Sequence, residues 1–329
     1  MNTKLDESQI SIVSGGAGFI GNQIIGRLIS EGRGVAVVDN FSRGLRAHLD
    51  VFAHNSLLHI IEADLSIRRE CMNAFDVAAT KGRVVEVWHL AANSDIPAGV
   101  ADPDVDLKDT FLTTFELLRC MKIFGIKSFH FASSSAVYGD LGSTPLHEGI
   151  VPLLPISNYG AMKLASEAQA SAAAESFLER VNIFRFPNVV GIPATHGVIF
   201  DFILKLLSNQ DVLHVLGDGS QQKAYMHVSD LVDAMFTVSS SKINEKIEVI
   251  NIGPVDEGVS VRWIAEQVVA RVSPYAKIKY GNGNKGWVGD VPRFNYSTDR
   301  LQSYGWSPKL NSSEAIIRAI DEIAIQKGF

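Results

Sequence analysis

The residues most able to do chemistry in this sequence are a tyrosine and a lysine four positions apart, Tyr159 and Lys163. Residues four apart share one face of an α-helix, and Ser157 is a good cap for a helix that begins just after it. A phenol has a pKa near 10 and is almost wholly protonated at pH 7, but a neighbouring cation favours its ionised form. The pair therefore indicates a group that can take up and return a proton.

Such a pair, taken alone, is more often a solvated surface pair. Its position favours chemistry, because it follows the hydroxyl-rich segment Ser133-Ser134-Ser135, which ends the apolar run Ser128–Ala132. The pair and these serines also come after a dinucleotide-type turn near the start of the chain.

That turn is marked by Gly15, Gly18 and Gly21, between the apolar run Ile10–Ser14 and the helical pattern Phe19–Leu28. A strand, a glycine turn and a helix in this order place a pyrophosphate over the amino end of the helix. The next apolar run, Gly34–Asp39, ends in a carboxylate about 20 residues on, where a ribose hydroxyl is bound in dinucleotide folds. The spacing therefore predicts a site for a dinucleotide cofactor.

Strand-like and helix-like runs alternate along the first half of the chain. We expect further strands over 57–61, 84–90 and 128–132, and helices over 67–80, 104–124 and 157–180. This alternation predicts an α/β fold of the Rossmann type, a doubly wound parallel sheet, with a smaller mixed α/β region at the C-terminal end. Residues at the carboxyl ends of its strands should converge on one crevice: Gly15, Asp39, Asp64, Ala91 and Ser134. We expect residues 1–190 to bind the cofactor and residues 191–329 mainly the substrate, with some segments returning to the sheet.

Composition excludes several function classes. The chain has 329 residues, of which 46% are hydrophobic, and a net charge of −6, which argues against nucleic acid as the main partner. It has no apolar run of membrane-spanning length, and its first nine residues do not resemble a secretory signal, so we expect a cytoplasmic protein without a membrane partner. The two cysteines predict no disulfide framework, and the nine histidines show no metal-ligand spacing, so no metal is expected.

Five motifs in order carry a family resemblance: Gly15-Gly-Ala-Gly-Phe-Ile-Gly21, His89-Leu-Ala-Ala92, Ser133-Ser-Ser-Ala-Val-Tyr-Gly139, Tyr159-Gly-Ala-Met-Lys163 and Phe184-Arg-Phe-Pro-Asn188-Val-Val-Gly191. The chain resembles the extended short-chain dehydrogenase/reductase superfamily. Within it, the chain is most similar to the NAD-dependent sugar-nucleotide epimerase/dehydratase family, and closest to UDP-glucose 4-epimerases.

The resemblance implies three catalytic residues and a cofactor, NAD. Tyr159 would be the acid/base, Lys163 would hold the nicotinamide ribose and lower the pKa of Tyr159, and Ser134 would hydrogen-bond the same sugar oxygen. Asp39 would bind the adenosine ribose, and Arg43 could instead contact the 2′-phosphate of NADP, which a carboxylate at Asp39 would repel. The cofactor positions that the resemblance implies are Gly15, Gly18, Phe19, Ile20, Gly21, Asp39, Asn40, Asp64, Leu65, Leu90, Ala91, Ala92, Tyr159, Lys163 and Phe186.

The resemblance also implies a nucleotide-sugar substrate, bound by Ser94, Ser134, Ser135, Asn188, Lys223 and Asp290. Two positions depart from the family, which usually has arginine where this chain has Lys223 and Trp287. Lysine keeps the charge but not the bidentate fork of arginine, and tryptophan keeps neither. Trp287 could stack on a ring of the substrate or fill a domain junction, and the identity of the sugar stays open.

Two residues indicate which of the family's reactions to expect. Family dehydratases place an Asp-Glu pair where this chain has Ser135 and Ala136, so elimination is disfavoured. The expected reaction is inversion at C4 of a nucleoside-diphosphate hexose through transient oxidation to a 4-keto sugar. The alternatives are a 4-ketoreductase, a decarboxylase or a dehydratase of the same superfamily, or a non-catalytic NAD-binding regulator. A homodimer through the helices over 104–124 and 157–180 is also expected, the alternative being their burial within the chain.

Overall fold

The computed structural model describes residues 9–142, 144–242, 245–283 and 295–329. The chain forms two compact units, and each unit is assembled from separate stretches. Unit 1 comprises Met1–Val137, Leu154–Arg185 and Ser239–Ile250, and unit 2 comprises Tyr138–Leu153, Phe186–Val238 and Asn251–Phe329.

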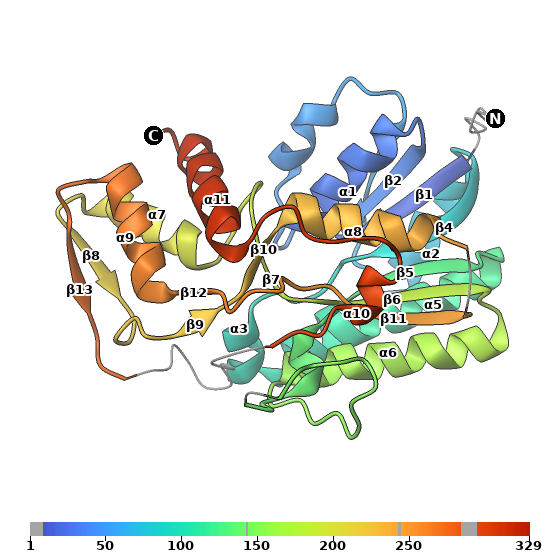
Figure 1. The fold of residues 1–329 in the computed structure, drawn as a ribbon. Coiled ribbons are helices and arrows are strands. Elements are labelled where there is room, and N and C mark those ends of the chain that lie inside the picture. The colour runs from blue at the N-terminus through green and yellow to red at the C-terminus, as the bar shows by residue number, and fades with distance from the viewer. Residues whose placement is uncertain (1–8, 143, 243–244, 284–294) are drawn as a thin grey trace. The chain divides into compact units, whose positions relative to one another are not determined.

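The predicted parallel sheet is the centre of unit 1 (Figure 1). Its seven strands follow the order β3-β2-β1-β4-β5-β6-β11, which is the strand order of a doubly wound dinucleotide fold. The pairs β1–β2, β2–β3, β1–β4 and β4–β5 are parallel. The strands are β1 (Gln9–Ser14), β2 (Gly34–Asp39), β3 (Leu58–Glu62), β4 (Arg83–His89), β5 (Ser128–Ser134), β6 (Arg180–Phe186) and β11 (Ile247–Asn251).

Helices cover both faces of this sheet because its strands bury side chains on both sides. On one face, Ile10 and Ile12 belong to a core with Phe75 and Leu117, contributed by α2 and α5. On the other face, α1 packs closely enough that a Cβ at Gly16 would touch both Val37 and Ile25. The helices of this part of the chain are α1 (Phe19–Ser30), η1 (Arg46–Phe52), α2 (Arg68–Ala79), α3 (Ile96–Ala101), α4 (Pro103–Asp106), η2 (Leu107–Leu112), α5 (Thr113–Phe124), η3 (Ser135–Tyr138) and α6 (Asn158–Ser176).

Two of the predicted helices differ from expectation. The helix predicted over 104–124 contains a π-helical segment, η2, between α4 and α5. The helix predicted over 157–180 ends at Ser176, because the backbone amides of Glu179 and Arg180 bond Lys127 O instead and lead into β6. The spacing of apolar residues predicts neither the π-helical segment nor the hydrogen bonds to Lys127 that follow the end of α6.

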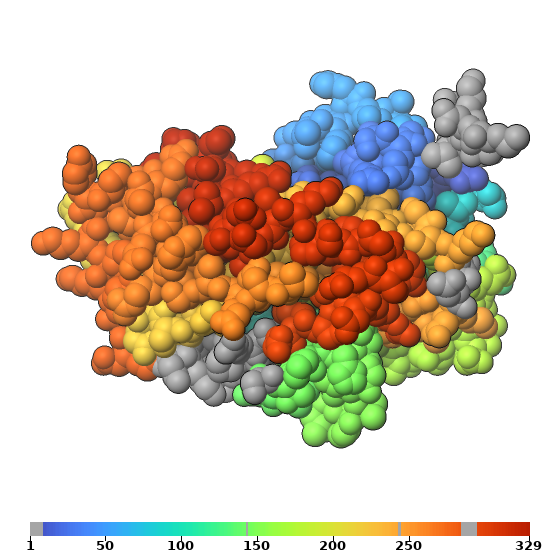
Figure 2. All heavy atoms as spheres, viewed as in Figure 1, coloured from blue at the N-terminus to red at the C-terminus, as the bar shows by residue number. Residues whose placement is uncertain are grey.

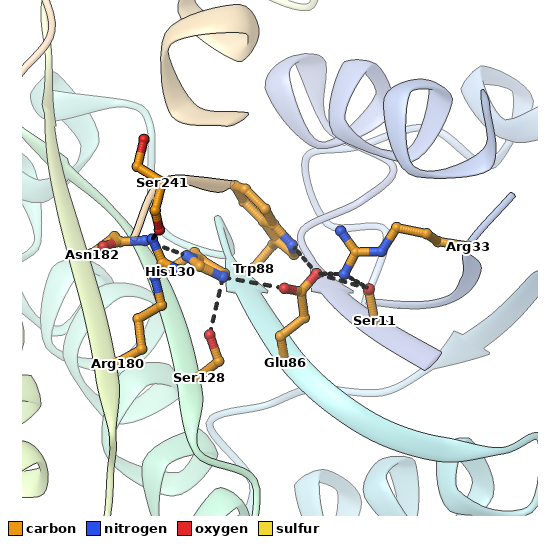
Figure 3. A network of polar contacts seen from close by, with 9 residues as sticks. All are labelled: Ser11, Arg33, Glu86, Trp88, Ser128, His130, Arg180, Asn182 and Ser241. Carbon is orange, nitrogen blue, oxygen red and sulfur yellow. Dashed lines mark hydrogen bonds and ion pairs between the residues drawn. The ribbon is translucent and has the colours of Figure 1, made fainter. Parts of the chain in front are cut away.

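A network of polar side chains crosses the sheet at Glu86 (Figure 3). Glu86 is paired with Arg33 and accepts a hydrogen bond from Trp88 Nε1 at 2.6 Å. Its other oxygen lies 3.3 Å from His130 Nε2, and Asn182 Nδ2 lies 2.9 Å from the second ring nitrogen of His130. The network ties β4, β5 and β6 to each other and to the residue that precedes β2.

Unit 2 is built from short two-stranded pairings and helices. β7 pairs with β10 and β13 with β8 in parallel, while β12 pairs with β9 in antiparallel fashion. Leu146 N donates to Asn295 O at 2.7 Å, and Leu146 forms an isolated parallel bridge with Tyr296. Figure 2 shows green and red-orange stretches of the chain side by side. The elements are β7 (Asn188–Val190), α7 (Val198–Ser208), β8 (Val212–Val215), β9 (Gln222–Lys223), β10 (Tyr225–His227), α8 (Val228–Ser240), β12 (Val259–Ser260), α9 (Val261–Val272), β13 (Lys277–Tyr280), α10 (Asp299–Gln302) and α11 (Ser312–Gln326).

Within the described ranges, none of the helices combines the length and the hydropathy that a membrane crossing requires.

Candidate functional site

Tyr159 lies in the first turn of α6, where the sequence places it. The Ser157 hydroxyl caps this helix by accepting a hydrogen bond from Gly160 N at 3.1 Å. The hydroxyl groups of Tyr159 and Ser134 are hydrogen-bonded to each other. Burial raises the pKa of Tyr159 to about 12, although the Ser134 hydrogen bond opposes this rise. The phenol therefore carries its proton and faces the end of β5.

Lys163 is one turn further along α6, with 2% of its surface exposed. Its Nζ donates to Ala132 O at 2.6 Å and lies 4.9 Å from the ring centre of Phe131 and 5.7 Å from that of Tyr159. Burial lowers the pKa of Lys163 to about 7. Burial is the largest influence on the pKa of Tyr159, and Lys163 Nζ is held by the β5 backbone. The lowering of the Tyr159 pKa by Lys163 together with the cofactor charge stays a prediction.

The sequence alone did not predict the ion pair between Glu167 and Arg185, which connects α6 to β6. Glu167, four residues after Lys163, accepts hydrogen bonds from Arg185 at 3.0 and 2.7 Å and from the Ser133 hydroxyl. All three residues are buried. A buried bidentate pair of this kind joins α6, β6 and the end of β5 in one geometry. The four-residue spacing of Lys163 and Glu167 was the available signal.

The glycine turn has the geometry that close approach of a ligand needs. Gly15 has φ +69°, and a Cβ there would lie 2.7 Å from Ala91 N. A Cβ on Gly21 would lie 2.4 Å from Gly15 O, so this glycine lets α1 start directly against the turn. Gly18 is the N-cap residue of α1, and no side chain caps the first amides of the helix. These amides and the helix dipole suit an anion.

Two carboxylates follow the strands beside this turn. Asp39, at the end of β2, is 8% exposed and accepts hydrogen bonds from Ala17 N at 2.9 Å and Phe41 N at 2.8 Å. Burial raises the pKa of Asp39, although these two amides oppose the rise. Asp64, after β3, accepts from the Ser66 hydroxyl at 2.6 Å and pairs with Lys108 at 3.1 Å. Burial opposes these contacts, but together they lower the pKa of Asp64.

The end of β4 is held by a buried chain of hydrogen bonds. His89 Nδ1 lies 2.6 Å from the Ser14 hydroxyl, and its Nε2 lies 2.9 Å from the Thr114 hydroxyl. Leu90 N donates to Ser14 O at 3.1 Å, which places Leu90 and Ala91 beside the glycine turn. Burial, with a smaller effect of the Lys163 charge, lowers the pKa of His89 to about 3, so the ring is neutral.

The other predicted cofactor positions lie in unit 1 near the same strand ends, with one exception. Phe19 and Ile20 are in the first turn of α1, Leu65 is buried after β3, and Asn40 is exposed after β2. Ala92 follows Ala91 and is half-buried. Phe186, the last residue of β6, is buried and belongs to unit 2.

The predicted substrate residues are divided between the units. Ser94 is exposed after β4, and Ser135 is buried directly after Ser134. Asn188 and Lys223 are half-buried in unit 2, where Asn188 Nδ2 donates to Ala224 O at 3.4 Å. Asp290 and Trp287 lie outside the described residues. No grouping of histidine, cysteine, aspartate and glutamate suited to a metal ion occurs among the residues that the structure describes.

The chain is similar to several known proteins over most of its length. Residues 11–253 match the model of the NAD dependent epimerase/dehydratase family. The putative UDP-glucose 4-epimerase of Methanocaldococcus jannaschii is 30% identical over 315 residues, covering 94% of this chain and 97% of that protein. The UDP-N-acetyl-alpha-D-glucosaminuronate decarboxylase of Bacillus cytotoxicus is 32% identical over 268 residues, covering 78% of each chain.

A solved structure is also similar to this chain. The UDP-glucose 4-epimerase of Thermus thermophilus, in complex with NAD, superimposes with a TM-score of 0.81 and 26% identity, covering 95% of this chain and 98% of the other.

Proposed function

This chain belongs to the NAD dependent epimerase/dehydratase family, and we propose from this premise that it inverts C4 of a nucleoside-diphosphate hexose with NAD as cofactor. The observation that carries the proposal is the hydrogen bond between Tyr159 and Ser134, with Lys163 on the same helix face. This arrangement presents a proton-carrying phenol and a hydroxyl to one substrate oxygen. The names of the similar epimerases support the choice of substrate class.

The residues around the glycine turn fit a dinucleotide. The uncapped first amides of α1 would bind the pyrophosphate, with Gly15 and Gly18 letting the backbone approach it. Asp39 would bind the adenosine ribose, and Asp64 and Leu65 would lie at the adenine. NAD is favoured over NADP because Asp39 would repel a 2′-phosphate and Arg43 is paired with Asp95 at 3.4 Å.

Side chains of the protein would transfer the proton of the sugar 4-hydroxyl. NAD, held by these residues, would supply the hydride acceptor for oxidation at C4 and the hydride donor for the return step. Tyr159 would act as the phenolate, a form that the positive charges of Lys163 and of the bound cofactor favour over the resting phenol. This phenolate would take the proton of the 4-hydroxyl and give it back after the sugar turns its other face. Ser134 would hold the same oxygen during the transfer, and Lys163 would bind the nicotinamide ribose and supply positive charge near the phenol. Positioning of C4 by these contacts would provide much of the acceleration.

Unit 2 would supply the substrate contacts. Asn188 and Lys223 are proposed to bind the diphosphate. Ser94, Ser134, Ser135 and Asp290 are proposed as further substrate contacts. The replacement of arginine by Lys223 removes a bidentate donor, so the base and the sugar need not be those of the similar proteins. A homodimer and a cytoplasmic location stay predictions.

Decarboxylation is the second candidate, because a similar protein is named a decarboxylase. That reaction begins with the same oxidation at C4 but needs a carboxylated sugar. Elimination is less suited, because Ser135 and Ala136 offer no acid next to Ser134.

The test is to incubate the purified protein, without added cofactor, with UDP-, dTDP-, GDP- and CDP-hexoses and UDP-hexuronates in deuterated water. Nuclear magnetic resonance should show C4 inversion of at least one sugar with no deuterium gained. Carbon dioxide release would favour the decarboxylase, and deuterium at C5 would indicate elimination or C5 epimerisation. Absence of turnover together with tight NAD binding would favour a regulator.

A further inference from the structure

Asp106, the last residue of α4, carries a carboxyl group that is wholly buried in unit 1. Its Oδ1 accepts a hydrogen bond from Asn93 Nδ2 at 2.8 Å. Its Oδ2 has no hydrogen-bond partner within the described part of the chain. Space for this oxygen exists because residue 99 is glycine, since a Cβ on Gly99 would lie 1.7 Å from it. Burying a carboxylate oxygen without a hydrogen bond costs folding free energy, so such a group in a folded protein needs an explanation.

Asp106 lies beside the helix that carries the catalytic pair. The start of α6 packs against α3, α4 and η2, and Asn158 Nδ2 donates to Gly99 O at 2.8 Å. Burial raises the pKa of Tyr159 and lowers that of Lys163, and the charge of Asp106 raises both. A carboxylate acts in this direction on a phenol because it repels the phenolate, and on a lysine because it stabilises the ammonium.

The other charged groups near the pair have partners of their own. Glu167 also faces Lys163, but it is bonded by Arg185 through two nitrogens. Asp95 and Asp109 face Asp106 from the loop after β4 and from η2. Asp95 forms an ion pair with Arg43, and the positive charge of Lys108 stabilises the ionised form of Asp109.

Burial raises the pKa of Asp106, as do the charges of Asp109 and Asp95, whereas the Asn93 hydrogen bond and the Lys163 charge lower it. No lysine or arginine of the described residues forms an ion pair with Asp106, and His89 is neutral. Lys163 is therefore the cation that stabilises the ionised form of Asp106.

We propose that Asp106 is the counter-charge of the Tyr159–Lys163 pair. Its carboxylate increases the charged fraction of Lys163 and favours the proton on Tyr159 in the resting site. Asp106 acts through these two residues and is therefore a positioning residue. This role rests on the proposed function, since it matters for a reaction in which Tyr159 moves a proton.

The test is Asp106→Asn, which removes the charge with little change of shape. Lys163 then becomes mostly neutral at pH 7, and turnover at that pH falls about tenfold. Both limbs of the pH profile of kcat/KM move to lower pH, because the loss of a negative charge lowers the pKa of both groups. The ultraviolet absorbance of the Tyr159 phenolate, taken as the difference from the same protein carrying Tyr159→Phe, also appears at lower pH.

Asp109→Asn is the matched control, because it removes a carboxylate from the next turn that does not face the pair. It leaves the phenolate titration in place. Gly99→Ala is a second variant, which changes no charge but displaces Oδ2, and it shifts the phenolate titration. Thermal unfolding shows whether each variant is folded.

A Tyr159 titration in Asp106→Asn that coincides with that of Asp109→Asn would overturn the proposal. If Asp106→Asn does not fold, an unchanged titration in Gly99→Ala would overturn it. The absorbance titration needs no substrate, so it tests Asp106 even if no sugar nucleotide is turned over.

Discussion

Burial acts on Tyr159 and Lys163 in opposite directions, bringing their pKa values to about 12 and about 7. Both shifts favour the neutral form, as a low-dielectric site requires. At neutral pH the lysine is therefore poised near half protonation, while the phenol holds its proton. A positive charge brought by a ligand would favour loss of a proton from both groups. The sequence predicted the pair from its spacing, but not this direction of the Tyr159 shift, because burial is not visible in a motif.

The first prediction concerns the phenol. Tyr159→Phe should keep NAD bound and lose at least about 100-fold in kcat, because the proton acceptor for the 4-hydroxyl is gone while the fold is unchanged. Steady-state kinetics and the amount of nucleotide released on denaturation measure the two effects. Tyr275→Phe is the control, since Tyr275 is 98% exposed and should leave both values unchanged. Near-normal turnover in Tyr159→Phe would exclude Tyr159 as the acid/base.

Asp106 shows why some site residues could not be predicted. It belongs to an acidic stretch with Asp102, Asp104 and Asp109, which in a sequence is typical of a solvated surface. Only the fold reveals that Asp106 is wholly buried while Asp102 and Asp104 are exposed. Glu167 could be predicted in part, because the sequence shows its helical spacing from Lys163 but not its ion pair with Arg185.

At the scale of elements, the site is made by strand ends. β1, β2, β4 and β5 are parallel neighbours and deliver Ser14, Asp39, His89 and Ser134 to the same edge of the sheet. The glycine turn and α1 follow β1, which lies between β2 and β4. Alternating strand and helix patterns predicted this convergence, because connections in such sheets leave from the carboxyl ends.

The second prediction tests the turn. Gly15→Ala should lose bound NAD and destabilise the fold, because the residue has φ +69° and its new Cβ would meet Ala91 N at 2.7 Å. Gly32→Ala is matched in backbone conformation, with φ +74°, but has nothing within 4 Å. It should cost about 1 to 2 kcal/mol and retain NAD. Urea unfolding and nucleotide content separate the two, and equal NAD loss in both variants would contradict the account.

The third prediction concerns acid stability. Burial alone would raise the pKa of Glu86, but hydrogen bonds from His130 and Trp88 and the charge of Arg33 lower it to about 2. Since a depressed carboxyl pKa stabilises the fold only while the group is ionised, this contribution is complete above the ordinary value of 4.5 and disappears as the pH falls toward 2. Glu86→Gln should therefore cost up to about 3 kcal/mol at pH 7, and the difference from the wild type should shrink below pH 4.

Glu62→Gln serves as the comparison for Glu86→Gln, because the Glu62 side chain is 65% exposed beside Arg46. An exposed pair of this kind contributes about 0 to 1 kcal/mol. Denaturant unfolding across pH 3 to 8 measures both variants. A Glu86→Gln effect that does not vary with pH would mean that the network stabilises by shape and not by charge.

At the scale of the whole molecule, the parallel sheet and the order of its elements could be predicted. The sequence suggested a division near residue 190 with some later segments returning to the sheet, but not which segments these are. Each compact unit takes in three separate stretches. Residues 239–250 return to unit 1 and bring in most of β11. Long-range pairing of this kind leaves no periodic signal, because short strands far along the chain look alike in composition.

The fourth prediction is the oligomeric state. Ile123 on α5 is 58% exposed and Phe115 38%, which gives the predicted dimer helix an apolar outer face. Light scattering after size-exclusion chromatography should show a dimer, and Ile123→Glu should convert it to a monomer. Ile325→Glu on α11 is the control, because Ile325 is 67% exposed but lies on a different helix. A wild-type monomer would show that these helices serve another purpose.

The central claim is that one carbon of the sugar gives up a hydride and receives it back. The direct measurement is turnover of the accepted nucleotide sugar labelled with deuterium at C4. The account predicts that the inverted product keeps the deuterium at C4 and that turnover of the labelled sugar is slower than that of the unlabelled one. Inversion with loss of that deuterium to water would contradict it.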